Sequence, residues 1–139
     1  MRIRVAGLAA VLLFLTTALV VRHLNGQRVV DSSGALSQYS GTALYAAMVY
    51  AGVFVLRPRT SPLVGAAAAL VFCWGVECFQ LTGIPAALSA RSMLARLALG
   101  VSFDPQDLLW YAVGVVPAVG VHAWLRRGAA PWTRRDGGS

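Results

Sequence analysis

Four long apolar stretches, separated by short polar segments, dominate the pattern of this chain. They cover residues 5–21, 39–56, 63–81 and 108–125 and contain 17 to 19 residues each. A helix of that length can cross the hydrocarbon core of a bilayer with modest tilt. The pattern therefore predicts an all-α fold, an integral membrane four-helix bundle.

The segments around these stretches predict the remaining elements. Residues 84–99 have no turn residues after Pro85 and predict one short interfacial helix between helices three and four. We expect residues 1–127 to form a single transmembrane domain and residues 128–139, rich in Gly and Arg, to form a disordered tail. The first stretch has a cleaved signal peptide as its alternative, but it is long and is followed by Arg22-His23-Leu24-Asn25 rather than by small residues. A retained helix is favoured.

Composition supports the membrane class. Hydrophobic residues make up 58% of the 139 residues and charged residues 12%, whereas about 25% of residues are charged in a soluble domain. All twelve basic residues are Arg, and the net charge is +7. The arginines stand at the ends of the apolar stretches and do not form a stripe with interleaved aromatics, so nucleic acid is not an expected partner. They are typical of topology determinants that also meet anionic lipid headgroups.

The distribution of arginines predicts the orientation. With four spans, both termini and the turn between the second and third stretches lie on one side. That side holds eight arginines (2, 4, 57, 59, 126, 127, 134 and 135), and the other side holds four (22, 28, 91 and 96). The positive-inside rule then predicts a multi-pass protein of the bacterial inner membrane with both termini in the cytoplasm.

One carboxylate, Glu77, interrupts the third apolar stretch. A charge near the centre of a membrane helix costs about 2.5–3.5 kcal/mol and less toward the ends, so such a residue is expected to have a purpose. Gln80 lies three residues further on, on the same face of the helix. Asp107 stands at the outer entry of the fourth span, with Tyr111 one turn later. These residues predict a polar cluster at the outer membrane face.

Arg91 is the fifth member of this expected cluster. On a helix its neighbours would be apolar, so we expect a carboxylate partner, Glu77 or Asp107. Three interpretations stay open. The cluster only fixes helix packing through buried ion pairs; or it is an outward binding or enzymatic site for a polar headgroup or sugar, with Arg91 for an anionic group and Glu77 or Asp107 as base; or it is a proton or ion path. A small transporter would have to be oligomeric, because four helices enclose little volume. Asp104, just before Pro105, is expected to cap the last helix.

Cofactor chemistry has no support in the sequence. No nucleotide-binding, zinc-protease or nucleophile-elbow motif is present. Cys73 and Cys78 lie five residues apart on one predicted helix, too far for a disulfide, and no histidine stands near them to complete a metal site. We therefore expect no cofactor and no metal, and the sequence leaves open whether the protein is an enzyme. The expected partners are the lipid bilayer and, as candidates, an anionic lipid, an envelope precursor or further copies of the chain.

The order of several residues resembles a known family. It runs through Gly41, Ala43-Leu44-Tyr45-Ala46, Glu77-x-x-Gln80, Arg91, Leu99-Gly100, Phe103, Asp107-Leu108-Leu109-x-Tyr111 and Gly114. Over residues 36–119 this order resembles domain-of-unknown-function family 2809, small bacterial membrane proteins without an assigned activity.

A more distant likeness is to the VanZ-like family, whose motif also runs Glu-x-x-Gln, Arg, Asp, Gly. Members of that family are associated with low-level glycopeptide resistance. The likeness implies that Glu77, Gln80, Arg91 and Asp107 are the corresponding polar positions. The chain departs from that motif in its longer stretch between Arg91 and Asp107, and in Tyr111, where the family has Asn.

Overall fold

The structure, a computed structural model, describes residues 2–26 and 35–128. It contains α1 (Arg2–Gly26), α2 (Ala35–Leu56), α3 (Pro62–Gln80), α4 (Ile84–Ser89), α5 (Met93–Leu99) and α6 (Pro105–Gly128). The all-α prediction is confirmed, and four of these helices are long and apolar enough to span a membrane. The tail expected at residues 128–139 lies outside the described residues, except that α6 continues through Gly128.

Local signals set the start of two of the long helices. Before α3, Ser61 has an extended backbone, and its Oγ accepts a hydrogen bond from the Val64 N–H at 3.3 Å. Before α6, Asp104 Oδ1 accepts from the Gln106 N–H at 2.9 Å, with Pro105 at the first helical position. Both arrangements satisfy N–H groups that a helix start leaves without intrahelical partners. The cap expected at Asp104 is confirmed.

The prediction of one helix over residues 84–99 is wrong in detail, because two short helices occupy this segment. The break is at Ser92, whose backbone is extended (φ −144°, ψ 124°) and whose Oγ accepts from the Ala95 N–H at 3.3 Å. Serine competes with the helical backbone for such hydrogen bonds and favours caps over helix interiors. The segment therefore folds back on itself as a helical hairpin, α4–α5.

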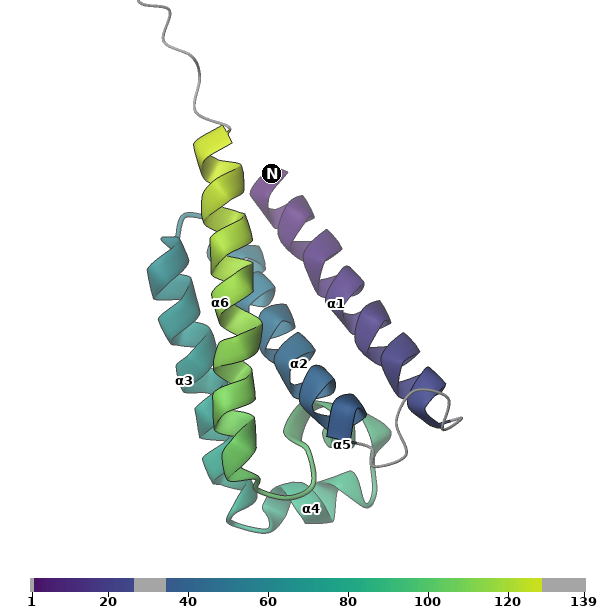
Figure 1. The fold of residues 1–139 in the computed structure, drawn as a ribbon. Helices are drawn as coiled ribbons and strands as arrows, with labels where there is room; N and C mark the ends of the chain where they lie inside the picture. Colours follow the sequence, from purple (N-terminus) through teal and green to yellow (C-terminus); the bar gives the residue numbers. More distant parts are fainter. Residues whose placement is uncertain (1, 27–34, 129–139) are drawn as a thin grey trace, which may run out of the picture.

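The four long helices run up and down, and the two short ones lie together at one end (Figure 1). We call the end that carries α4 and α5 the hairpin end. The opposite end, called the terminal end, carries the start of α1, the α2–α3 turn and the last turn of α6. Among the described helices, α1 contacts α2 only, whereas α2, α3 and α6 pack against one another.

The core lies between α2, α3 and α6. Its buried members are Ala46, Tyr50, Phe54, Ala69, Cys73, Tyr111 and Val115. Two helices approach closely at Gly114: a Cβ built there would overlap the backbone carbonyl of Ala43 on α2. Gly41 and Gly52 of α2 make no such contact with the described residues, because a Cβ at either position would meet nothing within 4 Å.

The outer surface of the bundle is apolar. Leu12 and Leu13 on α1 are 60% and 62% exposed, and Leu63 on α3 is 76% exposed. Many other leucines and valines of the long helices are exposed in the same way. Apolar surface this extensive is rare on a soluble monomer and is what a helix bundle presents to lipid. The chain is thus a multi-pass membrane protein by helix length and composition.

A polar cluster at the hairpin end

Glu77 lies on a stripe of α3 that is turned inward. The stripe begins with small residues, Gly65, Ala69 and Cys73, and continues through Glu77 to Gln80. These residues recur every three or four positions, so they share one helical face. Small side chains let α2 and α6 approach closely, and Glu77 ends up 0% exposed. A charged side chain that is fully excluded from solvent requires hydrogen-bond partners.

Both oxygens of Glu77 have such a partner. The Asp104 backbone N–H donates to Oε1 at 2.6 Å, and the Tyr111 hydroxyl donates to Oε2 at 2.9 Å. Both oxygens therefore accept a hydrogen bond, so the buried carboxyl group is satisfied. The Asp104 N–H lies just before α6 and Tyr111 in its second turn, so Glu77 ties the hairpin end of α3 to that helix.

Asp107 reaches a different helix. The Thr42 hydroxyl of α2 donates to Asp107 Oδ1 at 3.0 Å. One turn earlier on α2, Gln38 Nε2 donates to Asp104 Oδ2 at 2.9 Å. Gln38 and Thr42 are four residues apart and so share a face of α2. The sequence prediction missed this contribution from α2, although the i, i+4 spacing of two polar residues at the start of that helix signals it.

Gln80 connects α3 to the hairpin. Its Nε2 donates to the Leu99 carbonyl at 2.7 Å. The next residue, Gly100, has a positive φ of 69°, and its carbonyl accepts from the Ser89 hydroxyl at 2.7 Å. Gln80 Oε1 is buried and has no hydrogen-bond partner within the described part of the chain. The end of α5 is therefore held to both α3 and α4.

Arg91 differs from the prediction. It lies exposed in the turn between α4 and α5, and the partners of Glu77 are neutral donors instead. The break at Ser92 gives the physical reason, because it places Arg91 in a turn rather than on a continuous helix with apolar neighbours. An exposed guanidinium also avoids the desolvation cost of a buried ion pair.

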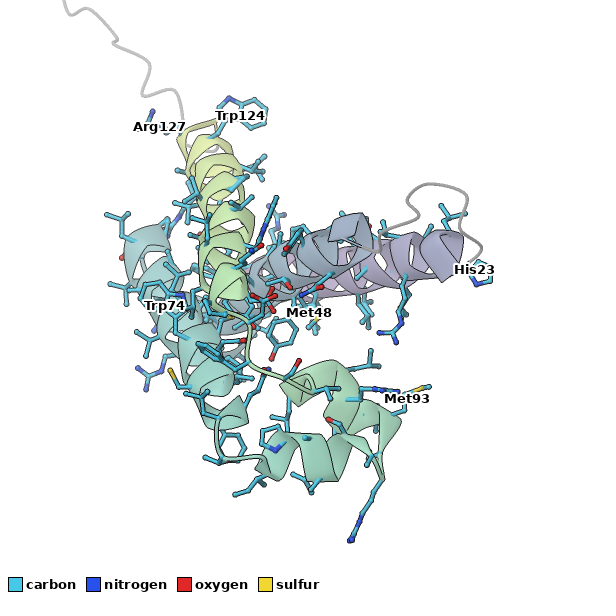
Figure 2. The ribbon with its side chains drawn as sticks, turned by 60° about the horizontal axis from the view of Figure 1, so that its bottom comes forward. His23, Met48, Trp74, Met93, Trp124 and Arg127 are labelled. Atoms are coloured by element: carbon cyan, nitrogen blue, oxygen red, sulfur yellow. The ribbon has the colours of Figure 1, made fainter. Side chains whose placement is uncertain are left out.

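Two aromatic rings stand beside the half-exposed carboxylates. Tyr39 of α2 and Trp110 of α6 are stacked, with ring centroids 5.1 Å apart and planes 13° from parallel. The Tyr39 hydroxyl also donates to the Gln106 side-chain carbonyl. On α3, three residues before Glu77, Trp74 (labelled in Figure 2) donates through Nε1 to the Leu108 carbonyl at 3.2 Å. Stacked rings and cross-helix hydrogen bonds fix the relative position of α2, α3 and α6 at this end.

The cluster thus has two parts. The sealed part consists of the buried side chains Glu77, Gln80 and Tyr111. The rim consists of side chains that are half-buried or exposed, namely Gln38, Tyr39, Thr42, Asp104, Gln106, Asp107 and Trp110. Within residues 2–26 and 35–128, no group of three His, Cys, Asp or Glu side chains is arranged to hold a metal ion. The rim combines two half-buried carboxylates with aromatic surface.

Most of the chain is similar to one known protein family. Residues 32–115 match the family described as "Protein of unknown function (DUF2809)". The chain belongs to this family. The match spans α2 to the middle of α6 and so includes every residue of the sealed part and the rim. No curated protein matches the DUF2809 chain, and no solved structure matches it.

Proposed function

We propose that this DUF2809 protein resides in the bacterial inner membrane with both termini in the cytoplasm, and that its rim faces outward and binds a hydroxyl-rich headgroup. The ligand class is an envelope lipid or a glycan precursor carried on lipid. The protein is proposed to act by binding, with no catalytic step assigned to the cluster.

The observation that carries the proposal is the contrast between the sealed part and the rim. Glu77 is fully buried and both of its oxygens are occupied, so it is unsuited to act as a base on a ligand. Asp104 and Asp107 are only half-buried, and each is held by a side chain of α2. The hydrogen bonds of the sealed part and of α2 hold the rim carboxylates in fixed positions. A specific binding site requires accessible polar groups that are held in this way.

The chemistry of the rim favours hydroxyl or ammonium groups over phosphate. A carboxylate accepts hydrogen bonds and repels anions. The arginine expected to receive an anionic group, Arg91, lies in the exposed turn of the hairpin. The stacked Tyr39–Trp110 pair adds flat apolar surface beside the carboxylates, and binding sites combine such surface with a few oriented polar groups.

The distribution of arginines supports the orientation. Six described arginines stand at the terminal end, namely Arg2, Arg4, Arg57, Arg59, Arg126 and Arg127, whereas Arg22, Arg91 and Arg96 stand toward the hairpin end. Short arginine-rich segments remain in the cytoplasm. The distant likeness to the VanZ-like family is part of the same proposal, because its association with glycopeptide resistance is compatible with a role at the cell envelope.

A second candidate is that the cluster only fixes helix packing. Its specific support is again Glu77, whose burial and complete hydrogen bonding need no ligand. Buried polar groups can specify one arrangement of helices without acting on anything else. The two candidates differ over the rim: the first expects the rim to bind a headgroup, and the second does not.

The distinguishing experiment measures lipid binding to the purified full chain by native mass spectrometry. The probes are a diglucosyl diacylglycerol and a phosphatidylglycerol with the same acyl chains. The test variants, Asp104→Asn and Asp107→Asn, keep an acceptor oxygen for the cap and for Thr42 but lose the charge. Because hydrogen bonds to charged groups contribute about 1 kcal/mol more than neutral ones, we expect each variant to bind the glycolipid roughly fivefold more weakly.

The control is Glu77→Gln, which makes the same chemical change in the sealed part. We expect it to lower stability while the folded fraction still binds the glycolipid. Unchanged glycolipid binding by both rim variants, or an equal loss of phosphatidylglycerol binding in them, would refute the binding proposal and leave the packing role. The orientation is tested separately by a C-terminal green fluorescent protein fusion, which fluoresces only if the terminus is cytoplasmic.

A further inference from the structure

A second candidate site lies at the terminal end, opposite the rim. An open hollow of about 1150 Å³ separates the start of α1 from the α2–α3 turn. Its lining includes Arg2, Ile3 and Arg4 from α1 and Arg57, Pro58 and Arg59 from the turn. Two segments more than fifty residues apart in sequence thus bring four guanidinium groups to one place.

Helix packing fixes this juxtaposition. One to two turns below the hollow, Gly7 of α1 lies against α2: a Cβ at Gly7 would be 3.0 Å from Val55 Cγ2 and 3.3 Å from the Ala51 carbonyl oxygen. The turn itself is ordered by backbone hydrogen bonds from the Arg57 N–H to the Val53 carbonyl at 2.7 Å and from the Thr60 N–H to the Arg57 carbonyl at 3.1 Å. The arginines are therefore carried by backbone that packing and hydrogen bonds hold in place.

None of the carboxylates that the structure describes lies near the positive charge of this hollow. Glu77, Asp104 and Asp107 all lie at the hairpin end, near the opposite ends of the long helices. Four guanidinium groups around one hollow repel one another, and a bound anion offsets that repulsion. Each guanidinium presents a planar set of donors that matches the oxygens of a phosphate.

The surroundings of the hollow are apolar and favour a lipid over a free anion. Leu56 and Leu63, which flank the lining segment on either side, are 78% and 76% exposed, and Val64 is 61% exposed. Ile3 is itself part of the lining and is 45% exposed. A headgroup held by the arginines would therefore have its acyl chains alongside the lipid-facing surface of the bundle.

We propose that this hollow binds the phosphate headgroup of an anionic phospholipid, using the guanidinium groups of Arg2, Arg4, Arg57 and Arg59. This site is independent of the proposed function of the rim, since it lies at the other end of the molecule and uses other residues. Failure of one proposal therefore leaves the other standing.

The test uses the full chain in detergent and cardiolipin as the probe, measured by native mass spectrometry. The variant is Arg57→Gln combined with Arg59→Gln. Its matched control is Arg126→Gln combined with Arg127→Gln, which removes the same charge from exposed positions at the same end, outside the hollow. We expect the hollow variant to bind cardiolipin about tenfold more weakly and the control to change by less than about twofold.

Two further arms keep the result decisive. Arg2→Gln combined with Arg4→Gln removes charge from the opposite wall and must weaken binding as well, and it replaces the first variant if that variant fails to accumulate. Inorganic phosphate at millimolar concentration must leave cardiolipin bound. Equal losses of cardiolipin binding in the hollow and control variants would show that positive charge attracts the lipid without a specific site, and would overturn the proposal. Displacement of cardiolipin by inorganic phosphate would overturn the assignment of the site to a lipid.

Discussion

Removing the Tyr111 hydroxyl tests the sealed part of the polar cluster most directly. Tyr111→Phe deletes the donor to Glu77 Oε2 and leaves the ring, which is 5% exposed, in its place in the core. Tyr45→Phe is the matched control, since Tyr45 lies against Tyr111 with ring centroids 6.4 Å apart. Its hydroxyl donates to the Ala98 backbone carbonyl at 2.9 Å and not to a charge.

The expected magnitude follows from the burial of Glu77. Interhelical hydrogen bonds in membrane proteins contribute only about 0.6 kcal/mol on average, because the unfolded chain also finds partners. Hydrogen bonds to charged groups contribute about 1.5–3 kcal/mol. Glu77 is 0% exposed, so in the variant Oε2 has no solvent to replace the lost donor. We therefore expect Tyr111→Phe to lower the free energy of unfolding by about 2 kcal/mol and Tyr45→Phe by less than about 1 kcal/mol.

The assay is reversible unfolding in mixed micelles of dodecyl maltoside and sodium dodecyl sulfate, followed by circular dichroism. A cycle with Glu77→Gln isolates the pairwise energy between the two residues. A loss for Tyr111→Phe no larger than that for Tyr45→Phe, or a coupling below about 0.5 kcal/mol, would refute the claim that this hydrogen bond stabilises the buried carboxyl group.

Three further substitutions, two of them paired with a comparison variant, test the helix contacts and caps around the cluster by the same unfolding assay. Gly114→Ala should destabilise the protein by about 1–3 kcal/mol, because its methyl group would overlap the α2 backbone. Gly120→Ala is the comparison: a Cβ there has nothing within 4 Å, so this variant should be more stable by about 0.5–1 kcal/mol. Gly100→Ala should cost about 1–2 kcal/mol, since φ is +69° and the new Cβ would be 2.6 Å from Gln80 Nε2; an unchanged stability would contradict this geometry. Asp104→Ala should cost about 1 kcal/mol through the lost cap of α6, and Asp104→Asn should recover most of that loss.

The membrane class and the long helices were predictable from the sequence because they depend on local composition. A stretch of about 18 apolar residues satisfies its backbone hydrogen bonds only as a helix when it is in lipid. The cap at Asp104 was predictable for the same reason, since an Asp-Pro pair at a helix start acts within one turn. The inward stripe through Cys73 and Glu77 likewise follows from helical spacing within α3.

The helix break at Ser92 could not be predicted from the sequence of this segment alone. The apolar residues between Pro85 and Leu99 are compatible with one helix, and nothing in the order of residues requires a turn. The hairpin instead brings Ser89 to the Gly100 carbonyl and Leu99 to Gln80. These contacts join residues up to 19 positions apart. The helix break at Ser92 therefore depends on contacts that form only in the packed structure.

The sequence by itself determined that Glu77 lies in an apolar helix and requires a polar partner. Only the tertiary structure decided which partner. The closing of α6 onto α3 places the Asp104 N–H and the Tyr111 hydroxyl at its two oxygens, while Arg91 stays in an exposed turn. The physical reason is that a backbone N–H has no sequence signature, and the cost of burying a guanidinium depends on the final packing.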